Sequence, residues 1–254
     1  MICAALVGLV LGAAPACGLP PLAPGDRPWR VNEALTYDLD FLGVVKAGTL
    51  QLAVERPMSG GKIVPLRARA RTSPSIGSVK PFAGVALSWI DSATLLPERY
   101  RDEAEEGGVH KTSDTRLAPA AREVVIEYRY GDSAGKAAYP RERDVLDALS
   151  TIYYLRAARL GPGDRFCFDL VANRRFWRLE GTVAARTEKV ETPAGRFETV
   201  RVDATTRRAD RPEEKSRAIH LWFGTDARRL PVAIVSELDV GPASATLSAV
   251  RGGR

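Results

Sequence analysis

The sequence predicts an all-β fold, namely a large curved antiparallel sheet or open β-barrel with one central α-helix packed against it. Apolar and polar residues alternate through most of the chain, which is the period of half-buried strands. Turn residues divide these stretches into roughly a dozen strands, at the spacing that antiparallel all-β folds show. Only residues 144–159 carry a clear helical period, so a single helix is expected.

The chain opens on an apolar leader. Residues 1–16 carry no charge and end in Ala14-Pro15-Ala16, an A-x-A type cleavage signal, although the Lys or Arg that usually opens a secretory leader is missing. Cys17 follows directly, and three fates remain open: lipid attachment at Cys17, simple cleavage, or an uncleaved anchor. We predict export to the periplasm or envelope, and contact with a membrane only in the case that a lipid is attached at Cys17. No later run approaches the roughly 20 apolar residues of a membrane helix.

Cysteines are few. They are Cys3, Cys17 and Cys167, and only the last lies far from the leader. We therefore expect no internal disulfide. Cys167 lies in a strand-like run and is interpreted as a small residue on a half-buried sheet face rather than as a reactive thiol.

Beyond the leader the sequence predicts a Pro-rich surface linker, 17–31, and a single β-barrel-like domain, 32–254. Residues 73–86 are expected to form a loop with a short helical turn. The strands expected before the helix lie near 33–41, 50–54, 66–71, 87–91, 98–104, 109–115 and 124–130. Those expected after it lie near 166–170, 177–183, 200–204, 219–223, 231–238 and 243–250.

The predicted helix spans Asp144–Arg159. Asp144 is expected to cap its first turn, and Gly161-Pro162-Gly163 ends it. The apolar stripe is wide enough that the helix should pack against the sheet. The stripe consists of Val145, Leu146, Leu149, Ile152 and Tyr153.

Four segments are recognisable together, in order: NEALTYDLDFLGVVKAGTL, DALSTIYYLRAARLGPGD, ETPAGRFETVRV and LWFGTDARRLPVAI. They resemble a bacterial envelope family, the domain-of-unknown-function family 3108, over about residues 32–250. Asn32 stands where that family usually has Gly, and Gly224 where it usually has Ser. The resemblance implies an exported, all-β, barrel-like protein with no assigned reaction, and it supplies no catalytic residues.

The residue types that catalysis needs do not cluster. Of the two histidines, neither His110 nor His220 has another His or a Cys within five residues, so no metal site is predicted. His110 and Asp114 are interpreted as an exposed hairpin pair, and His220, which shares a strand face with Trp222, as a packed or hydrogen-bonded histidine. The sequence contains no G-x-S-x-G elbow and no phosphate-binding Gly loop. We expect no enzymatic activity and no cofactor, with a hydrolase of envelope polymers as the third hypothesis.

The net charge of +6 comes from 37 Lys and Arg against 31 Asp and Glu, scattered among one another. Because no basic tail or binding motif accompanies this charge, nucleic acid is not an expected partner.

A curved sheet with a helix at its mouth can enclose an apolar cavity. The aromatic candidates to line it are Tyr153, Tyr154, Trp177 and Trp222, with simple core packing as the competing interpretation. The charged candidates have three interpretations: a buried ion pair that fixes the helix on the sheet, a cation at the cavity mouth for an anionic headgroup, or an ordinary solvated turn. They are Arg156, Asp226, Arg228 and Arg229.

The sequence therefore predicts an exported, non-catalytic protein that binds or scaffolds an apolar or amphipathic envelope component, such as a lipid. The alternative is a protein–protein interaction module of an envelope assembly that takes no small ligand and works through a sheet edge or face.

Overall fold

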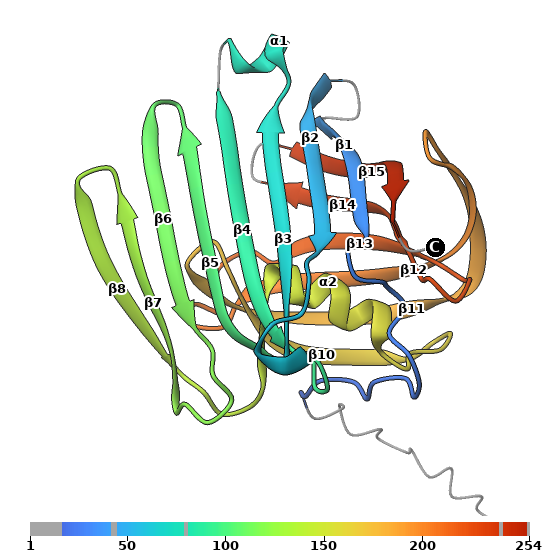
Figure 1. Ribbon diagram of the computed structural model, residues 1–254, viewed down its shortest axis with the longest axis horizontal. Coiled ribbons are helices and arrows are strands. Elements are labelled where there is room, and N and C mark those ends of the chain that lie inside the picture. The colour runs from blue at the N-terminus through green and yellow to red at the C-terminus, as the bar shows by residue number, and fades with distance from the viewer. Residues whose placement is uncertain (1–16, 42–44, 79–80, 239–240, 253–254) are drawn as a thin grey trace, which may run out of the picture.

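The computed structural model describes residues 17–41, 45–78, 81–238 and 241–252, and these form one open sheet of 15 strands (Figure 1). The all-β prediction is confirmed. The strands lie side by side in the order β8-β7-β6-β5-β4-β3-β2-β1-β15-β14-β13-β12-β11-β10-β9. The chain thus builds a first arm, β1–β8, and then a second arm, β9–β15, which joins the first where β15 pairs with β1. Of the strand pairs described, β9 with β10 is the parallel one.

The first arm consists of β1 Ala34–Phe41, β2 Val45–Val54, β3 Ile63–Thr72, β4 Phe82–Asp91, β5 Pro97–Glu106, β6 Val109–Arg116, β7 Glu123–Tyr130 and β8 Ser133–Pro140. The second consists of β9 Val145–Asp147, β10 Arg165–Ala172, β11 Arg175–Thr192, β12 Gly195–Arg208, β13 Arg217–Gly224, β14 Pro231–Leu238 and β15 Gly241–Arg251. The helical elements are η1 Ser59–Gly61, α1 Pro74–Gly77 and α2 Ala148–Ala157.

Helix α2 lies between the two arms, which wrap around it (Figure 1). It contacts β3 and β4 of the first arm and β9 and β10 of the second. Most of its side chains are buried. Helix α2 therefore supplies the middle of one continuous core rather than covering an outer face. No helix in the described part of the chain has the length and apolarity that crossing a membrane requires.

The helix is shorter than its sequence period indicates. Residues Val145–Asp147 form β9 and pair with β10. The prediction that Asp144 caps the helix is therefore wrong. Asp147 is the N-cap: its carboxylate accepts hydrogen bonds from the backbone N–H groups of Leu149 and Ser150, both at 2.8 Å. The Ser150 hydroxyl in turn accepts from the Asp147 N–H, which completes a capping box. Val145 and Leu146 are apolar because β9 is buried, just as a helix in the same place would be.

One strand boundary and one whole strand also differ from expectation. The loop predicted over 73–86 does contain a helical turn, α1, but β4 already begins at Phe82. The eight-residue strand β8 was not predicted. Its sequence, SAGKAAYP, is rich in residues that are rare in strands, and its pairing with β7 determines its conformation instead.

Residues 17–31, which we name the N-terminal strap, are not a surface linker. Gly18 forms a β-bridge with Cys167, and Leu22 forms one with Ala158 just after α2. Trp29 is buried and meets the ring of Tyr153 edge-on, with 5.2 Å between ring centroids. The strap is therefore part of the fold and packs on the helix, although its composition resembles that of a linker.

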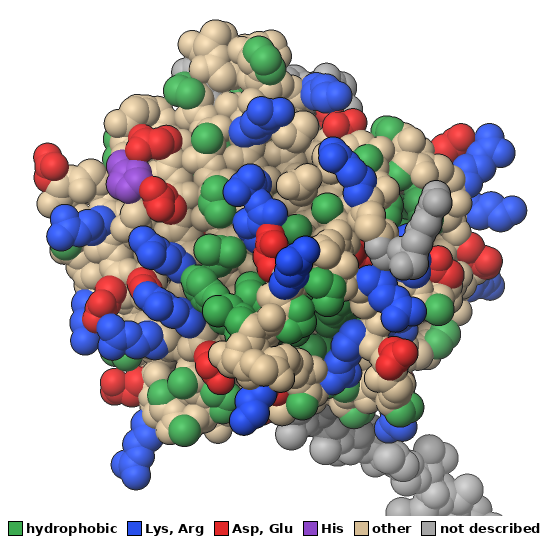
Figure 2. Space-filling view, in the orientation of Figure 1, with side chains coloured by type: hydrophobic (Ala, Val, Ile, Leu, Met, Phe, Trp, Pro, Cys, Tyr) green, Lys and Arg blue, Asp and Glu red, His purple; other side chains and the backbone are tan. Residues whose placement is uncertain are grey.

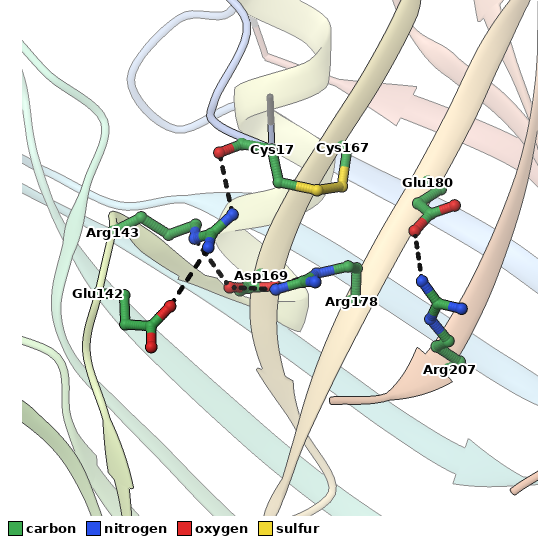
Figure 3. The surroundings of a disulfide bond; sticks show 8 residues. All are labelled: Cys17, Glu142, Arg143, Cys167, Asp169, Arg178, Glu180 and Arg207. Carbon is green, nitrogen blue, oxygen red and sulfur yellow. Dashed lines mark hydrogen bonds and ion pairs between the residues drawn. A yellow bond between two sulfur atoms is a disulfide. The ribbon is translucent and has the colours of Figure 1, made fainter. Parts of the chain in front are cut away.

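A disulfide joins Cys17 to Cys167, so the expectation of no internal disulfide is wrong (Figure 3). It fastens the start of the strap to β10. Beside it Arg143 donates to the Cys17 carbonyl at 3.1 Å, and the Asp169 carboxylate pairs with Arg178 at 2.9 Å. A sulfur in this bond cannot also carry a lipid thioether, so the structure opposes lipidation at Cys17. The leader, with Cys3, lies outside the described residues.

Candidate functional site

Helix α2 carries a buried charge, Arg156, in its last turn. Its partner is Glu33 rather than Asp226. Both side chains are fully buried, and the guanidinium donates to the Glu33 carboxylate at 2.8 Å. Arg228 reaches the same carboxylate at 3.1 Å. The Arg156 Nη2 also donates to the carbonyls of Pro28 and Arg228, both at 3.0 Å, while the buried Nε has no hydrogen-bond partner among the described residues. One carboxylate thus joins α2, the start of β1 and the loop before β14.

Aromatic rings close this cluster from water. The Arg156 guanidinium lies 5.4 Å from the ring centroid of Trp29 and 5.3 Å from that of Tyr153. Burial raises the pKa of the Tyr153 phenol, whose hydroxyl has no hydrogen-bond partner. Burial also lowers the pKa of Arg229, and the nearby charge of Arg156 adds to this. Because both members of the Arg156–Glu33 pair are fully buried, we interpret this cluster as one that fixes the helix in place.

The remaining predicted residues lie in separate places. Tyr154 is buried and donates to the Pro20 carbonyl of the strap at 2.9 Å. Trp177 is buried on β11 between the guanidinium groups of Arg208 and Arg217. Trp222 lies on the outer face of β13 and donates to Glu188. The eight predicted ligand-binding residues therefore do not form one cavity.

Asp226 organises a turn. Its carboxylate accepts from the backbone N–H of Arg229 at 3.1 Å, and Arg229 has φ of 42°, in the left-handed region. The turn holds the Arg228 carbonyl where Arg156 meets it. Asp226 is thus a local structural residue.

Neither histidine lies in a catalytic arrangement. His110 contacts Glu105 at 2.7 Å on an exposed hairpin, while Asp114 pairs with Arg99 instead of with His110. His220 contacts Asp203 at 2.6 Å on the outer face of the second arm. Among the described residues, no group of three His, Cys, Asp or Glu side chains is placed to hold a metal ion.

One pocket lies on the inner face of the first arm, where β3–β6 rise above the core and face the turn between β10 and β11. Its volume is about 310 Å³, near the lower end of the range for small-ligand sites. We name it the inner pocket. Its floor consists mainly of small side chains, and charged groups stand at its walls. Its lining includes Ala68, Ala70, Gly84, Ala86, Ala104, Phe82, Tyr100, Asp102, Lys111, Asn173 and Arg174.

The second arm contributes two neighbouring residues to the lining, and Arg174 is the charged one. Asn173 and Arg174 form the two-residue β10–β11 turn with φ of 48° and 59°, values that suit a hairpin of this length but that arginine seldom adopts. The guanidinium lies over two rings of β7, 5.4 Å from the centroid of Tyr128 and 5.7 Å from that of Tyr130. This cation–π contact bridges the two arms where no backbone ladder does so.

Asp102 stands in the same pocket. The Ser113 hydroxyl donates to its carboxylate. Burial raises the pKa of Asp102, and the Ser113 hydrogen bond and the charge of Arg174 oppose that shift. Lys111 is already paired, with Glu106, and lies 4.6 Å from the Tyr130 ring centroid. Glu103 and Glu106 also line the pocket, but Glu106 is paired with Lys111, and Asp102 and Arg174 are the carboxylate and guanidinium that we consider for ligand binding.

Sequence reasoning missed this pocket. The available signal was the run of Ala and Gly at alternate positions of neighbouring strands, such as Ala68, Ala70, Gly84 and Ala86, which leaves a sheet face unfilled. Arg174 gave no local signal, because its role depends on the contact between the arms.

A wider groove of about 900 Å³ runs over the outer face of β2–β5, lined in part by Arg69, Arg71, Glu103, Glu105 and His110. Side chains of both charges are interspersed on the face shown in Figure 2. The groove is lined mainly by residues of the first arm, whereas the inner pocket is lined by residues of both arms and contains the half-buried carboxylate of Asp102, so we take the inner pocket as the candidate site.

Comparison with known proteins supports the fold. Residues 36–248 match the sequence model of the family described as "Protein of unknown function (DUF3108)". Among solved structures, the β-barrel-like DUF1849 protein from Brucella abortus has a TM-score of 0.59 at 9% identity, covering 88% of this chain and 98% of that one. This likeness concerns the fold alone.

Two further structures show weaker likeness. A "putative exported protein with YmcC-like fold" from Bacteroides fragilis has a TM-score of 0.34 at 12% identity, covering 93% of this chain and 100% of that one. A "putative lipoprotein" from Parabacteroides distasonis has a TM-score of 0.33 at 10% identity, covering 89% and 97%. Among curated proteins, none matches this chain.

Proposed function

Starting from the membership of this chain in the DUF3108 family, a family without an assigned reaction, we propose that it is an exported, non-catalytic envelope protein that binds an apolar or amphipathic component in the inner pocket. The observation that carries this proposal is a pocket with small side chains on its floor and charged groups at its walls, lined by residues of both arms.

Two features support export. The uncharged apolar run 1–16 with its Ala14-Pro15-Ala16 ending has the pattern of a cleaved leader. The Cys17–Cys167 disulfide belongs to the chemistry of oxidising compartments such as the bacterial periplasm. Since Cys17 is engaged in this bond, the proposal is a protein of the periplasm or envelope without a lipid at that residue.

The pocket supports an amphipathic ligand because its parts differ in polarity. Ala70, Gly84 and Ala104 leave space that an apolar group can fill. Asp102 and Arg174 at the walls can meet a polar group on the same ligand. The residues around α2, by contrast, are packed against one another and support a structural role.

Native mass spectrometry and organic extraction of the protein purified from the periplasm test this function. We expect a bound amphiphile in the wild type and its loss in Ala104→Phe, which fills the pocket. Ala83→Phe, on the exposed outer face of β4, is the matched control and should retain the ligand. An empty wild type, or equal occupancy in both variants, would contradict the proposal.

A second candidate is the interaction module. Strand β8 ends the first arm, and its outer side pairs with no described strand, so it offers the backbone groups that a partner strand needs. Crosslinking in intact cells, followed by purification, would favour this function if a crosslink to a partner maps to β8 while the pocket proves empty.

A further inference from the structure

Five charged residues line the inner pocket, namely Asp102, Glu103, Glu106, Lys111 and Arg174, and of these Asp102 and Arg174 form no direct ion pair with each other. Among the described residues, neither Asp102 nor Arg174 has an oppositely charged side chain within 4.0 Å. The neighbouring Lys111 is different, because it forms its own pair with Glu106. Both unpaired groups line the same 310 Å³ space.

From this juxtaposition we infer that the inner pocket recognises a zwitterionic headgroup, with an ammonium on the Asp102 carboxylate and a phosphate or carboxylate on the Arg174 guanidinium. The inference rests on the proposed function and names the chemical class of its ligand. A ligand of one charge would leave either Asp102 or Arg174 without a partner in a half-buried site, which is unfavourable. A zwitterion satisfies both.

The position of each group is held in a way that suits binding. Ser113 donates to Asp102 and keeps the carboxylate oriented without neutralising it. Arg174 is held over Tyr128 and Tyr130, and aromatic faces leave the guanidinium N–H groups at its edge available to an anion. Its left-handed backbone is a conformation that costs energy in arginine and that such sites often retain.

The size of the pocket agrees with a headgroup. About 310 Å³ is too small for a complete two-chain lipid but fits a polar headgroup or one short chain. The small floor residues, such as Ala104 and Gly84, would then face the start of the apolar part. The partner is thus a phosphoethanolamine-type headgroup, carried by a lipid or free as a small zwitterion.

Isothermal titration calorimetry with three probes tests the inference: lysophosphatidylethanolamine and lysophosphatidylglycerol of equal chain length, both below their micelle concentrations, and free phosphoethanolamine. We expect the wild type to bind the zwitterionic lysolipid at least tenfold more tightly than the anionic one. Free phosphoethanolamine that binds as tightly as the lysolipid identifies a small zwitterion as the ligand, and tighter lysolipid binding identifies a lipid. Either outcome supports the inference.

The variants separate the two charges. Asp102→Asn keeps an acceptor for Ser113 and should abolish the preference for the zwitterionic lysolipid. Arg174→Gly removes the guanidinium and suits the positive φ, so it should fold and bind both lysolipids at least tenfold more weakly. Arg129→Ala removes an exposed charge from β7 and is the control that should bind as the wild type does.

Equal affinity for the two lysolipids, or variants that bind like the wild type, would overturn the inference while leaving an amphiphile-binding function in place. If no probe binds but the protein still purifies with an amphiphile, only the headgroup assignment fails. If no probe binds and nothing purifies with the protein, both the inference and the proposed function fail.

Discussion

Arg156 in the last turn of α2 and Glu33 next to the start of β1 form an ion pair of 2.8 Å in which neither side chain is exposed. Residues 123 positions apart are thus joined in the core. Desolvating both groups is costly, so the pair depends on the further contacts of Arg156 with the Pro28 and Arg228 carbonyls and of Arg228 with the carboxylate.

Glu33→Gln should lower the free energy of unfolding by about 3–5 kcal/mol, because it leaves the Arg156 and Arg228 charges without a counter-ion. Denaturant unfolding followed by tryptophan fluorescence measures this change. The exposed pair Arg207–Glu180 is the control, and Glu180→Gln should cost less than about 1 kcal/mol. If both variants lost a similar amount of unfolding free energy, the buried ion pair of Glu33 would matter no more for stability than the exposed pair of Glu180.

Asp147 should make stability depend on pH. Burial raises the pKa of this carboxyl to about 6, against the opposing hydrogen bonds from Ser88, Ser150 and Leu149. The folded state therefore favours the protonated form. The contribution of Asp147 to the free energy of unfolding is greatest below the ordinary pKa near 4. This contribution, roughly 3 kcal/mol, is lost as pH rises through about 6.

Asp147→Asn mimics the protonated form and should remove this dependence. The difference in unfolding free energy between wild type and Asp147→Asn, measured from pH 4 to pH 7, should shift in favour of the variant as pH rises. Ser88→Ala removes a donor at 2.6 Å from the carboxylate and should move the transition to higher pH. A difference that stays constant with pH would contradict the assignment.

The disulfide should be present in the mature protein and should stabilise it. Maleimide labelling without reductant should leave both Cys17 and Cys167 unmodified, whereas a chain lipidated at Cys17 would expose a free Cys167 thiol. Cys17→Ser should lower the unfolding free energy by about 2–4 kcal/mol. Cys167→Ser should cost the same, and the double variant no more, because each change breaks the same bond.

Gly181 should not tolerate a side chain. A Cβ there would overlap the ring of Phe166, which lies across the strand pair on β10. Gly181→Ala should cost about 1–3 kcal/mol. Gly161→Ala is the matched control, since its nearest neighbour would lie 3.7 Å away. In a double variant with Phe166→Leu the two costs should not add, because the overlapping ring is gone.

The sequence predicts those parts of the fold that depend on local pattern. Alternating runs such as 33–41 and 124–130 become strands because one face of each meets the core. Where tertiary contacts decide, local pattern fails. Val145 and Leu146 fit a helical stripe, yet β10 draws them into a strand. The strap has the composition of a linker, but the disulfide at Cys17 and the burial of Trp29 hold it against the core.

For the candidate site, too, the sequence indicates single residues but not the partners that the fold brings to them. The importance of Arg156 follows from its place in a recognisable motif, but its partner Glu33 lies too far along the chain for spacing to reveal. Asp102 and Arg174 come from different arms, and only the folded sheet brings them to one pocket.

The sheet has two unjoined ends, β8 and β9, so its circumference is not fixed by a count of hydrogen-bonded strands. Side chains span the seam instead: Tyr139 stacks on Phe176 at 5.3 Å, and Arg174 lies over Tyr128. Exchanging a few such residues can widen or narrow the interior without altering any ladder. The width of the interior therefore depends on side chains at the seam rather than on a closing backbone ladder.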